Sequence, residues 1–424
     1  MSSEGLFDML LGARPIFKRR EYLRHSYTPE KLPHRDEQIH QLARILVAPL
    51  RGETPSNILL YGKPGTGKTA TVNYVTKELA RVGDKAPMKI EVVYVNCEVV
   101  NTQYRILATL ADNFLESVRK SKGEGFAKST GLPLRVPMTG WPTDEVHATL
   151  LKALDCEPRL TVVVFDEVDK LVQRSGDEVL YKLTRMNSDM SNSKLSIIGI
   201  SNDTNFLEYL DPRVRSSMGE DEIVFPPYNG TQLQEILRQR AEMSFIDGAL
   251  ETGVIQLCSA HAAREHGDAR RALDLLRVAG EVAEADGSER VGVQHVAKAH
   301  ERIEQDKMVE VIKTLPAQSK LVLSSVVFLA ERTPRPVVSG EVYDVYQGLC
   351  RRNGLDILTS RRVSDLMSEL DVLGIITARI VNRGRGGRTK EIKLNVHPTQ
   401  VQAAVQEEYN VGEVPQVPVL AARG

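Results

Sequence analysis

The sequence predicts an α/β domain built around a parallel sheet, then a small helical domain, then an α+β domain of three helices and a β-hairpin. Three observations support this prediction. A glycine-rich loop follows an apolar run at residues 56–61, and a second apolar run at residues 160–165 ends in two acidic residues. Three helical patterns and an alternating hairpin pattern follow residue 316. A chain of 424 residues is long enough for two or three separate cores.

The composition is that of a soluble globular protein, with 42% hydrophobic and 26% charged residues. No segment approaches 18 uncharged apolar residues, so we expect no membrane contact and a cytoplasmic location. The four cysteines lie far apart without metal-like spacing, which favours buried thiols in a reducing compartment. They are Cys97, Cys156, Cys258 and Cys350.

A segment at residues 62–69, GKPGTGKT, has the spacing G-x-x-x-x-G-K-[ST]. In this pattern the glycines let backbone N–H groups wrap around phosphate oxygens at the start of a helix. A helix pattern follows, with Val72, Val75 and Leu79 on one face and Gly83 at its end. The order of strand, loop and helix favours a phosphate-binding loop over a chance glycine turn.

We therefore expect ATP or ADP to bind at this loop together with Mg²⁺. Lys68 would reach the β- and γ-phosphates, Thr69 would ligate Mg²⁺, and backbone amides would hold the phosphate oxygens. The expected cofactor-binding residues of this segment are Gly62, Pro64, Gly65, Thr66, Gly67, Lys68, Thr69 and Ala70.

Two further strand patterns end in polar residues. The run LTVVVF at residues 160–165 is typical of a central parallel strand and ends in Asp166 and Glu167. Asp166 is expected to hold the Mg²⁺ shell, and Glu167 to polarise the attacking water. The run SIIGIS at residues 196–201 ends in Asn202, which is expected to hydrogen-bond that water or the γ-phosphate. A solvated acid pair and an ordinary turn are the alternatives for these two strand ends.

The order of these segments predicts an AAA+ ATPase core with helices on both faces of its sheet. Two amphipathic helical patterns follow at residues 225–243 and 264–283, and they suit a helical lid. Together with the segments YTPEKLPHRDEQIHQL, VNCEVVNTQYRIL and PMTGWPTDEV, this order resembles the archaeal origin-recognition and cell-division-cycle initiator family. The resemblance extends from about residue 17 to about residue 396.

The resemblance implies roles for several residues. Arg270 matches the second sensor arginine that touches the γ-phosphate from the lid. Since Arg270 and Arg271 point about 100° apart on a helix, only one can face the phosphate, and we expect it to be Arg270. By resemblance, Tyr228 and Arg240 line the nucleotide site and residues 32–35 approach the adenine. Without it, a packing role for Tyr228 and a solvated position for Arg240 would be favoured.

Two segments have alternatives that the sequence leaves open. LDPRVRSSMG resembles the place where AAA+ assemblies present an arginine finger to a neighbouring subunit, with Arg213 and Arg215 as candidates. Ser217 stands where bacterial initiator relatives usually carry a further arginine, and a simple turn is the alternative. The family also places a DNA-contacting helical insert at residues 101–146, where a solvated loop is the alternative.

The patterns after residue 316 predict a winged helix. Its third helix is capped by Thr359 or Ser360 and closed by Gly374. The buried face of that helix is expected to consist of Val363, Leu366 and Leu370, and its outward face, which a recognition helix turns toward base edges, of Arg361, Arg362 and Asp365.

A local excess of basic residues marks this domain. Residues 351–393 contain ten Lys or Arg and five Asp or Glu, although the net charge of the whole chain is −1. Such an excess suits a surface that neutralises phosphates, and a merely soluble Arg- and Gly-rich hairpin is the alternative. The expected DNA-binding residues are Arg361 and Arg362 of the third helix and Arg383, Arg385 and Arg388 of the wing.

The expected function is that of an ATP-regulated DNA replication initiator, which binds double-stranded origin DNA and helps recruit or load the MCM helicase. Hydrolysis would be slow and regulatory, and other initiator subunits would be further partners. The rivals are a DNA motor of the branch-migration class and a nucleotide-dependent transcription regulator. The expected domains are an AAA+ core at 1–229, a helical lid at 230–305, a linker at 306–316, a winged helix at 317–410 and a tail at 411–424.

Overall fold

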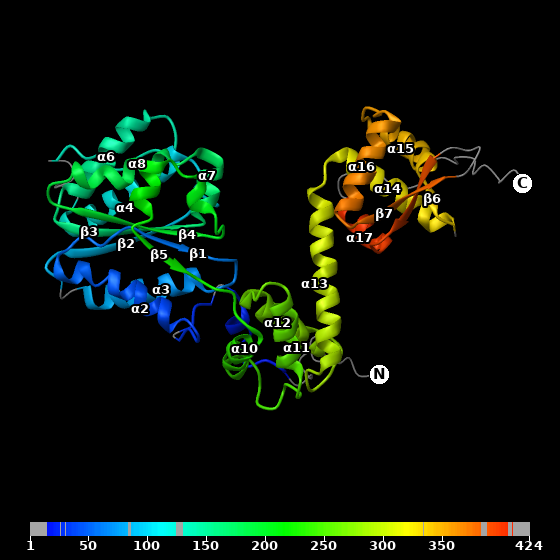
Figure 1. Ribbon diagram of the computed structural model, residues 1–424, viewed down its shortest axis with the longest axis horizontal. Coiled ribbons are helices and arrows are strands. Elements are labelled where there is room, and N and C mark those ends of the chain that lie inside the picture. Colours follow the sequence, from blue (N-terminus) through cyan, green and yellow to red (C-terminus); the bar gives the residue numbers. More distant parts are fainter. Residues whose placement is uncertain are drawn as a thin grey trace, which may run out of the picture. The chain divides into compact units, whose positions relative to one another are not determined.

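A five-stranded parallel sheet forms the centre of the N-terminal part of the chain in this computed structural model (Figure 1). The structure describes residues 15–25, 27–29, 31–83, 86–123, 130–333, 335–382, 388–405 and 409. The chain forms two units, Met1–Val296 and Ala297–Gly424.

The order of the strands determines where the site lies. Across the sheet they run β2 (Lys89–Asn96), β3 (Arg159–Asp166), β4 (Lys194–Ser201), β1 (Ile58–Tyr61) and β5 (Asp221–Val224). Because β4 pairs in parallel with both β1 and β3, the carboxyl ends of these three strands lie side by side. The register places Tyr61 opposite Ser201 and Asp166 opposite Ile200.

Helices cover both faces of this sheet, as the sequence predicts. Alternate residues of each strand enter different cores: Ile58 and Leu60 pack on one side and Leu59 on the other. The first side is covered by α2 (Asp36–Ile45) and α3 (Lys68–Val82). The second side is covered by α4 (Gln103–Lys122), α6 (Thr143–Asp155), α7 (Val168–Ser175), α8 (Glu178–Arg185) and α9 (Pro212–Met218). Among its described residues this unit also has the short 3-10 helices η1 (Arg20–Leu23), η2 (Ala48–Arg51), η4 (Met186–Ser188) and η5 (Phe206–Tyr209).

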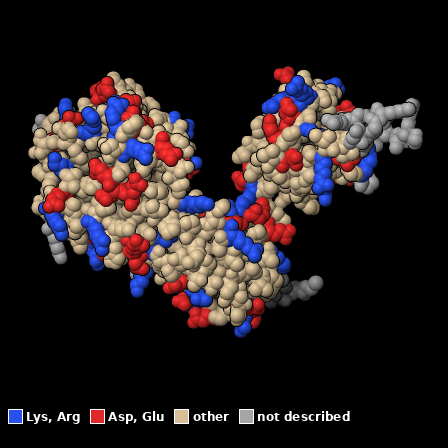
Figure 2. Space-filling model, viewed as in Figure 1, with Lys and Arg blue, Asp and Glu red and all other residues tan. Residues whose placement is uncertain are grey.

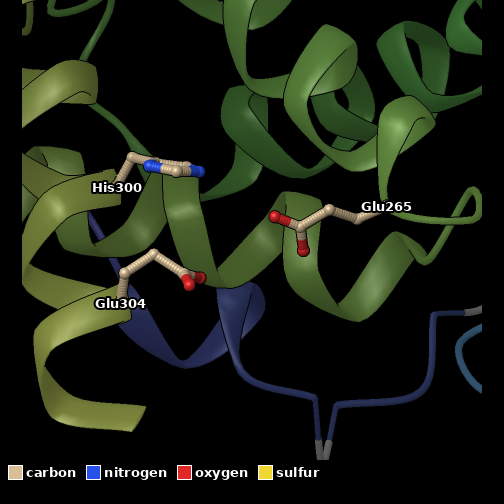
Figure 3. Close-up of side chains that lie close together, drawn as sticks. All are labelled: Glu265, His300 and Glu304. Carbon is tan, nitrogen blue, oxygen red and sulfur yellow. The ribbon is translucent and has the colours of Figure 1, made fainter. Parts of the chain in front are cut away.

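The helical lid follows β5. It contains α10 (Gly230–Ser244), α11 (Val254–Arg264) and α12 (Ala269–Ala285), and α13 (Val293–Thr314) begins after it. The last of these continues as one helix through residues 306–314, within the expected linker. His300 and Glu304 lie one turn apart on α13, and Glu265 is the C-cap residue of α11 (Figure 3).

The N-terminal segment at residues 15–25 packs on the lid rather than on the sheet. The backbone N–H of Lys18 donates to the carbonyl of Ser244 at 2.7 Å. The rings of Phe17 and Phe245 lie 4.6 Å apart. The chain therefore crosses between lid and core twice: once from this segment to α2, and once from β5 to α10.

The second unit contains the predicted winged helix. Its three helices are α14 (Ala317–Arg332), α15 (Ser339–Asn353) and α16 (Ser360–Val372), and its hairpin consists of β7 (Ile376–Asn382) and β8 (Arg388–Leu394). Of the two residues predicted as the cap of α16, Thr359 and Ser360, it is Thr359 whose side chain accepts from the backbone N–H of Arg362. Two further elements are not predicted from the sequence: β6 (Val337–Val338), which pairs with β8, and the helix α17 (Pro398–Val405).

The predicted faces of α16 are confirmed. Val363, Leu366 and Leu370 are buried, whereas Arg361, Arg362 and Asp365 are exposed. All four cysteines are free, and Cys156 is only partly buried. Among the described residues, no helix combines the length and apolar character that a membrane span requires.

Replacing Leu370, which is fully buried, with Ala should lower the free energy of opening of α16 by about 2–5 kcal/mol because it leaves a cavity. Hydrogen exchange of the α16 amides measures this quantity for the second unit alone. The matched control is Asp365→Ala on the exposed face of the same helix, which should change it by less than about 0.5 kcal/mol. Equal effects of the two changes would contradict the assigned face.

Candidate functional site

The glycine-rich loop connects β1 to α3 and lines the candidate pocket. Gly65 and Gly67 adopt left-handed φ values of 72° and 88°. A Cβ atom on Gly67 would lie 2.8 Å from the hydroxyl of Tyr228, so a larger residue would not fit without displacing that ring. Lys68 begins α3, so the loop ends at a helix N-terminus, where anions bind favourably.

Lys68 is buried at the base of this loop, with 5% of its surface exposed. Its ammonium group donates to the carbonyl oxygens of Gly62 and Lys63, at 2.7 and 2.9 Å. Burial, with a smaller effect from the charge of Arg270, lowers the pKa of Lys68 to about 8. A phosphate group would offset both effects, because it supplies the opposite charge.

Thr69 and Asp166 meet although 97 residues separate them. The Thr69 hydroxyl donates to Oδ2 of Asp166 at 3.0 Å, and the backbone N–H of Glu167 donates to Oδ1 at 3.1 Å. Burial raises the pKa of Asp166, and these hydrogen bonds oppose that rise. A hydroxyl and a carboxylate at this spacing are the oxygen ligands that Mg²⁺ prefers.

Glu167 follows Asp166 in a left-handed conformation, with a φ of 57°. A non-glycine residue held in this region stores backbone strain, which is common at functional sites. Burial, together with the carboxylates of Glu98, Asp166 and Asp169, raises the pKa of Glu167. The side-chain amide of Asn202 donates to Oε1 of Glu167 at 3.4 Å, so the two strand-end residues are brought together.

The lid reaches the loop through the first turn of α12. The backbone N–H of Ala269 donates to the carbonyl of Gly65 at 3.3 Å. Asp268 caps α12 by accepting from the N–H groups of Arg270 and Arg271. Arg270 lines the pocket, whereas Arg271 forms an ion pair with Glu265 and is not among the lining residues.

Arg240 lines the pocket from α10, but its guanidinium is engaged. It donates to the carbonyls of Tyr22 and Tyr27, at 3.1 and 3.2 Å, and lies over the Tyr27 ring. This side chain therefore fastens the N-terminal segment to the lid beside the pocket. Leu32 and Pro33 also line the pocket.

Most residues of the predicted nucleotide site converge on this one pocket. The predicted residues among its lining are Gly65, Thr66, Gly67, Lys68, Thr69, Ala70, Asp166, Glu167, Asn202, Tyr228, Arg240 and Arg270. Gly62 and Pro64 are not among the lining residues. Of the segment at 32–35, His34 and Arg35 are not among them either.

The chemistry of this pocket fits a magnesium nucleotide. The donor set combines loop amides, the cation of Lys68 and the oxygen pair of Thr69 and Asp166. Apolar lining from Leu32, Pro33, Ile236 and Leu273 offers a surface for a purine ring.

The two arginine-finger candidates differ in their surroundings. Arg213 donates two hydrogen bonds to the carboxylate of Asp211, at 2.9 and 3.2 Å, and lies over the Tyr181 ring. Arg215 is exposed on α9, and within the described part of the chain no ion pair engages it. Of the pair, Arg215 is therefore the more available to another subunit.

The predicted insert begins with α4, a helix of 20 residues whose last turn contains Arg119, Lys120 and Lys122. Two basic residues of this region are paired within the chain, Lys120 with Glu116 and Arg135 with Asp112. Residues 124–129, at its centre, lie outside the described residues.

The predicted DNA-binding side is exposed but only partly described. Arg362 pairs with Glu369 at 3.4 Å. Arg388 begins β8, and Arg383 and Arg385 lie outside the described residues. Figure 2 shows Lys and Arg mixed with Asp and Glu over the visible faces of both units.

Two tyrosines hold the start of α16. The Tyr343 hydroxyl donates to the carbonyl of Leu358 at 3.1 Å, and the N–H of Leu358 donates to the Tyr346 hydroxyl at 3.2 Å. Leu358 directly precedes the cap residue Thr359. Both backbone polar groups of Leu358 are therefore hydrogen-bonded to tyrosine side chains, which fixes the backbone just before the candidate recognition helix.

Comparison with known proteins identifies the family. The AAA ATPase domain model matches residues 31–198, the Cdc6 AAA+ ATPase-type lid domain matches 234–301, and the CDC6 C-terminal winged helix domain matches 310–404. An ORC1-type DNA replication protein of Pyrococcus abyssi is 56% identical over 406 residues, covering 96% of this chain and 94% of that protein. This chain belongs to the ORC1-type DNA replication protein family.

Two further similar proteins, one compared by sequence and one by structure, support the same family assignment. A relative from Methanosarcina acetivorans is 52% identical over 412 residues, covering 97% of this chain and 95% of that protein. The structure of the Aeropyrum pernix ORC1 protein in complex with DNA is 43% identical, with a TM-score of 0.72, covering 93% of this chain and 97% of that one. The resemblance and the predicted fold class are thereby confirmed.

Two residues beside the pocket have contacts that the sequence does not predict. The S/T/D/N cap signal before a helical pattern marks Asp268 as a helix cap, but it does not indicate that this residue lies against the glycine-rich loop. Arg35 belongs to the segment that the resemblance places near the adenine, and in the structure its guanidinium donates to the carbonyls of Thr66 and Pro226. No local pattern predicts those partners.

Gly65→Ala should weaken ADP binding at least about tenfold. The added Cβ would lie 1.7 Å from Oδ1 of Asp268, so the lid contact must shift, and the left-handed φ costs roughly 1–2 kcal/mol besides. Isothermal titration measures the affinity. Gly176→Ala is the matched control, since Gly176 has a φ of 73° and no heavy atom within 4 Å of the added Cβ. If both variants bound ADP equally well, the lid contact at Gly65 would have no part in nucleotide binding.

Proposed function

We propose that this member of the ORC1-type family is an ATP-controlled switch that binds origin DNA. The observation that carries the proposal is the convergence of loop, acidic strand end and lid arginine on one pocket. Lys68, Asp166 and Arg270 come from three different parts of the N-terminal unit and line the same space. A nucleotide bound there would contact both core and lid, so its phosphate state can set their closure.

The proposed role of each side chain at the nucleotide site follows from its charge and its hydrogen-bonding groups. Lys68 would neutralise the β- and γ-phosphates, and the loop amides would orient them. Mg²⁺, held through Thr69 and Asp166, would neutralise charge that develops on the phosphate oxygens. Arg270 would reach the γ-phosphate from α12, so that the lid responds to its presence.

Hydrolysis would require Glu167 to accept a proton from the attacking water. The water oxygen bonds to the γ-phosphorus, the bond from that phosphorus to the β–γ bridging oxygen breaks, and ADP and phosphate result. The amide of Asn202, which donates to Glu167 at 3.4 Å, would keep that carboxylate in place. Slow, regulatory turnover is proposed because Ser217 stands where bacterial initiator relatives usually carry a further arginine, which leaves Arg213 and Arg215 as the finger candidates, and Arg213 is paired with Asp211.

The winged helix is the proposed DNA-binding domain. Arg361 and Arg362 lie in the first turn of α16, where a recognition helix contacts base edges. Arg383, Arg385 and Arg388 would contact phosphates or the minor groove from the wing. The Aeropyrum pernix ORC1 protein, a relative of this chain, was solved in complex with DNA, which supports DNA binding as the function of this protein.

Recruitment or loading of the MCM helicase, and assembly with other initiator subunits, are proposed from family membership. The proposed domains are the core at 1–229, the lid at 230–305, the linker at 306–316, the winged helix at 317–410 and the tail at 411–424. A cytoplasmic location is proposed on the same basis.

Glu167→Gln should lower the steady-state ATPase rate by about 10²–10⁴-fold, because the amide cannot accept the proton. ATP binding should stay within a few-fold of the unchanged protein. Glu98→Gln is the control, since this carboxylate influences Glu167 but does not line the pocket. A rate unaffected by Glu167→Gln would remove this residue from the proposed mechanism.

DNase footprinting on the organism's own genomic DNA, with ATP and with ADP, tests the DNA function. We expect discrete protected sites at replication start sites, with protection that differs between the nucleotides. Arg361→Ala should weaken binding to such a site by about 1–3 kcal/mol while changing affinity for random DNA little. Arg388→Ala should weaken both. Equal losses on both DNAs for Arg361→Ala would refute base recognition by this residue.

A further inference from the structure

Arg35 is one of the most deeply buried charged residues of the N-terminal unit. Only 2% of its surface is exposed. It directly precedes α2 and follows His34, whose φ of 62° is left-handed. A strained residue of this kind persists only where the surrounding structure holds it in place.

The guanidinium of Arg35 joins three separate segments by hydrogen bonds to backbone carbonyls. Nε donates to Thr66 of the glycine-rich loop at 2.8 Å. Nη1 donates to His34 at 3.0 Å, and Nη2 donates to Pro226, between β5 and α10, at 2.7 Å. The same group stacks 3.8 Å from the centre of the Tyr228 ring.

Within the described ranges, no carboxylate pairs with this buried charge. Burial lowers the pKa of Arg35, and the electrostatic interaction with Tyr228 opposes that effect. Arg159 shows the contrast: it is also fully buried, but it pairs with Glu91 and Glu157. An unpaired buried cation is costly for folding alone, so its position behind an anion-binding loop points to a role in that loop.

The bond to Thr66 sets the direction of the next backbone amide. In a trans peptide, the carbonyl of one residue and the N–H of the following residue point in opposite directions. Because Arg35 holds the Thr66 carbonyl behind the loop, the N–H of Gly67 is directed to the other side. Gly67 is one of the residues that line the pocket.

We propose that Arg35 is a positioning residue for the phosphate subsite: it holds the Thr66–Gly67 peptide so that the loop presents its amide to a nucleotide phosphate. This inference rests on the proposed nucleotide binding. It assigns to Arg35 an effect on phosphate recognition, with no contact to the adenine.

The experiment compares ATP with adenosine, which lacks phosphates, by isothermal titration on the full chain. Arg35→Met should weaken ATP binding about ten- to a hundredfold, the range expected for losing a hydrogen bond to a charged group. Adenosine binding should change less than about twofold. The melting temperature without nucleotide reports any general loss of stability separately.

Arg159→Met is the matched control, because it also removes a fully buried arginine from the same unit. It should lower the melting temperature and leave the ATP-to-adenosine affinity ratio unchanged. If Arg35→Met does not fold, Arg35→Lys replaces it: lysine retains the cation but cannot bridge Thr66 and Pro226, so the same phosphate-selective loss is expected.

An unchanged affinity ratio in the Arg35 variant would overturn the inference, as would an equal ratio change in Arg159→Met. Failure of the unchanged protein to bind ATP more tightly than adenosine would instead overturn the proposed function itself. The two failures are thereby distinguished.

Discussion

The insertion of β4 between β1 and β3 is the constraint on which the site depends. It brings the carboxyl ends of three strands from distant parts of the sequence to one edge of the sheet. Asp166 ends β3 and Asn202 directly follows β4, so strand pairing brings these two residues to the same edge. The glycine-rich loop carries the chain from β1 to Thr69 in α3, where its hydroxyl donates to Asp166. A sheet buried on both faces is rigid, which suits a site that must hold charged ligands at fixed distances.

The features that the sequence predicts well are those that depend on patterns of neighbouring residues. The loop glycines, the acidic end of β3, the cap Thr359 and the buried face of α16 all follow from spacing within a few residues. The partners of Arg35 and Arg240 could not be predicted in this way, since they are carbonyl oxygens up to 191 and 218 residues distant. Every residue has a backbone carbonyl, so the residue types in the sequence do not indicate which carbonyl accepts a hydrogen bond. β6, with only two residues, is likewise too short for its alternation to be recognised.

Non-glycine residues with strained, left-handed backbone conformations occur close to the pocket. Among the described residues, three non-glycine residues adopt left-handed φ values, namely His34, Glu167 and His266. His34 precedes Arg35, Glu167 lines the pocket, and His266 precedes the lid contact of Asp268 while its ring lies 3.3 Å from the Lys63 ammonium. The segment before α2, the acidic strand end and the lid thus each contain one conformation that only tertiary contacts maintain. Such positions are expected where geometry serves binding rather than stability.

The two passages of the chain between lid and core limit how the lid can move. One passage runs into α2 and the other leaves β5, and Arg35 hydrogen-bonds to both. Two covalent connections restrict the orientations open to the lid more than one connection would. A change at the phosphates of a bound nucleotide would therefore act on a lid with fewer alternative positions, and the difference in affinity between those positions would set how far their populations shift.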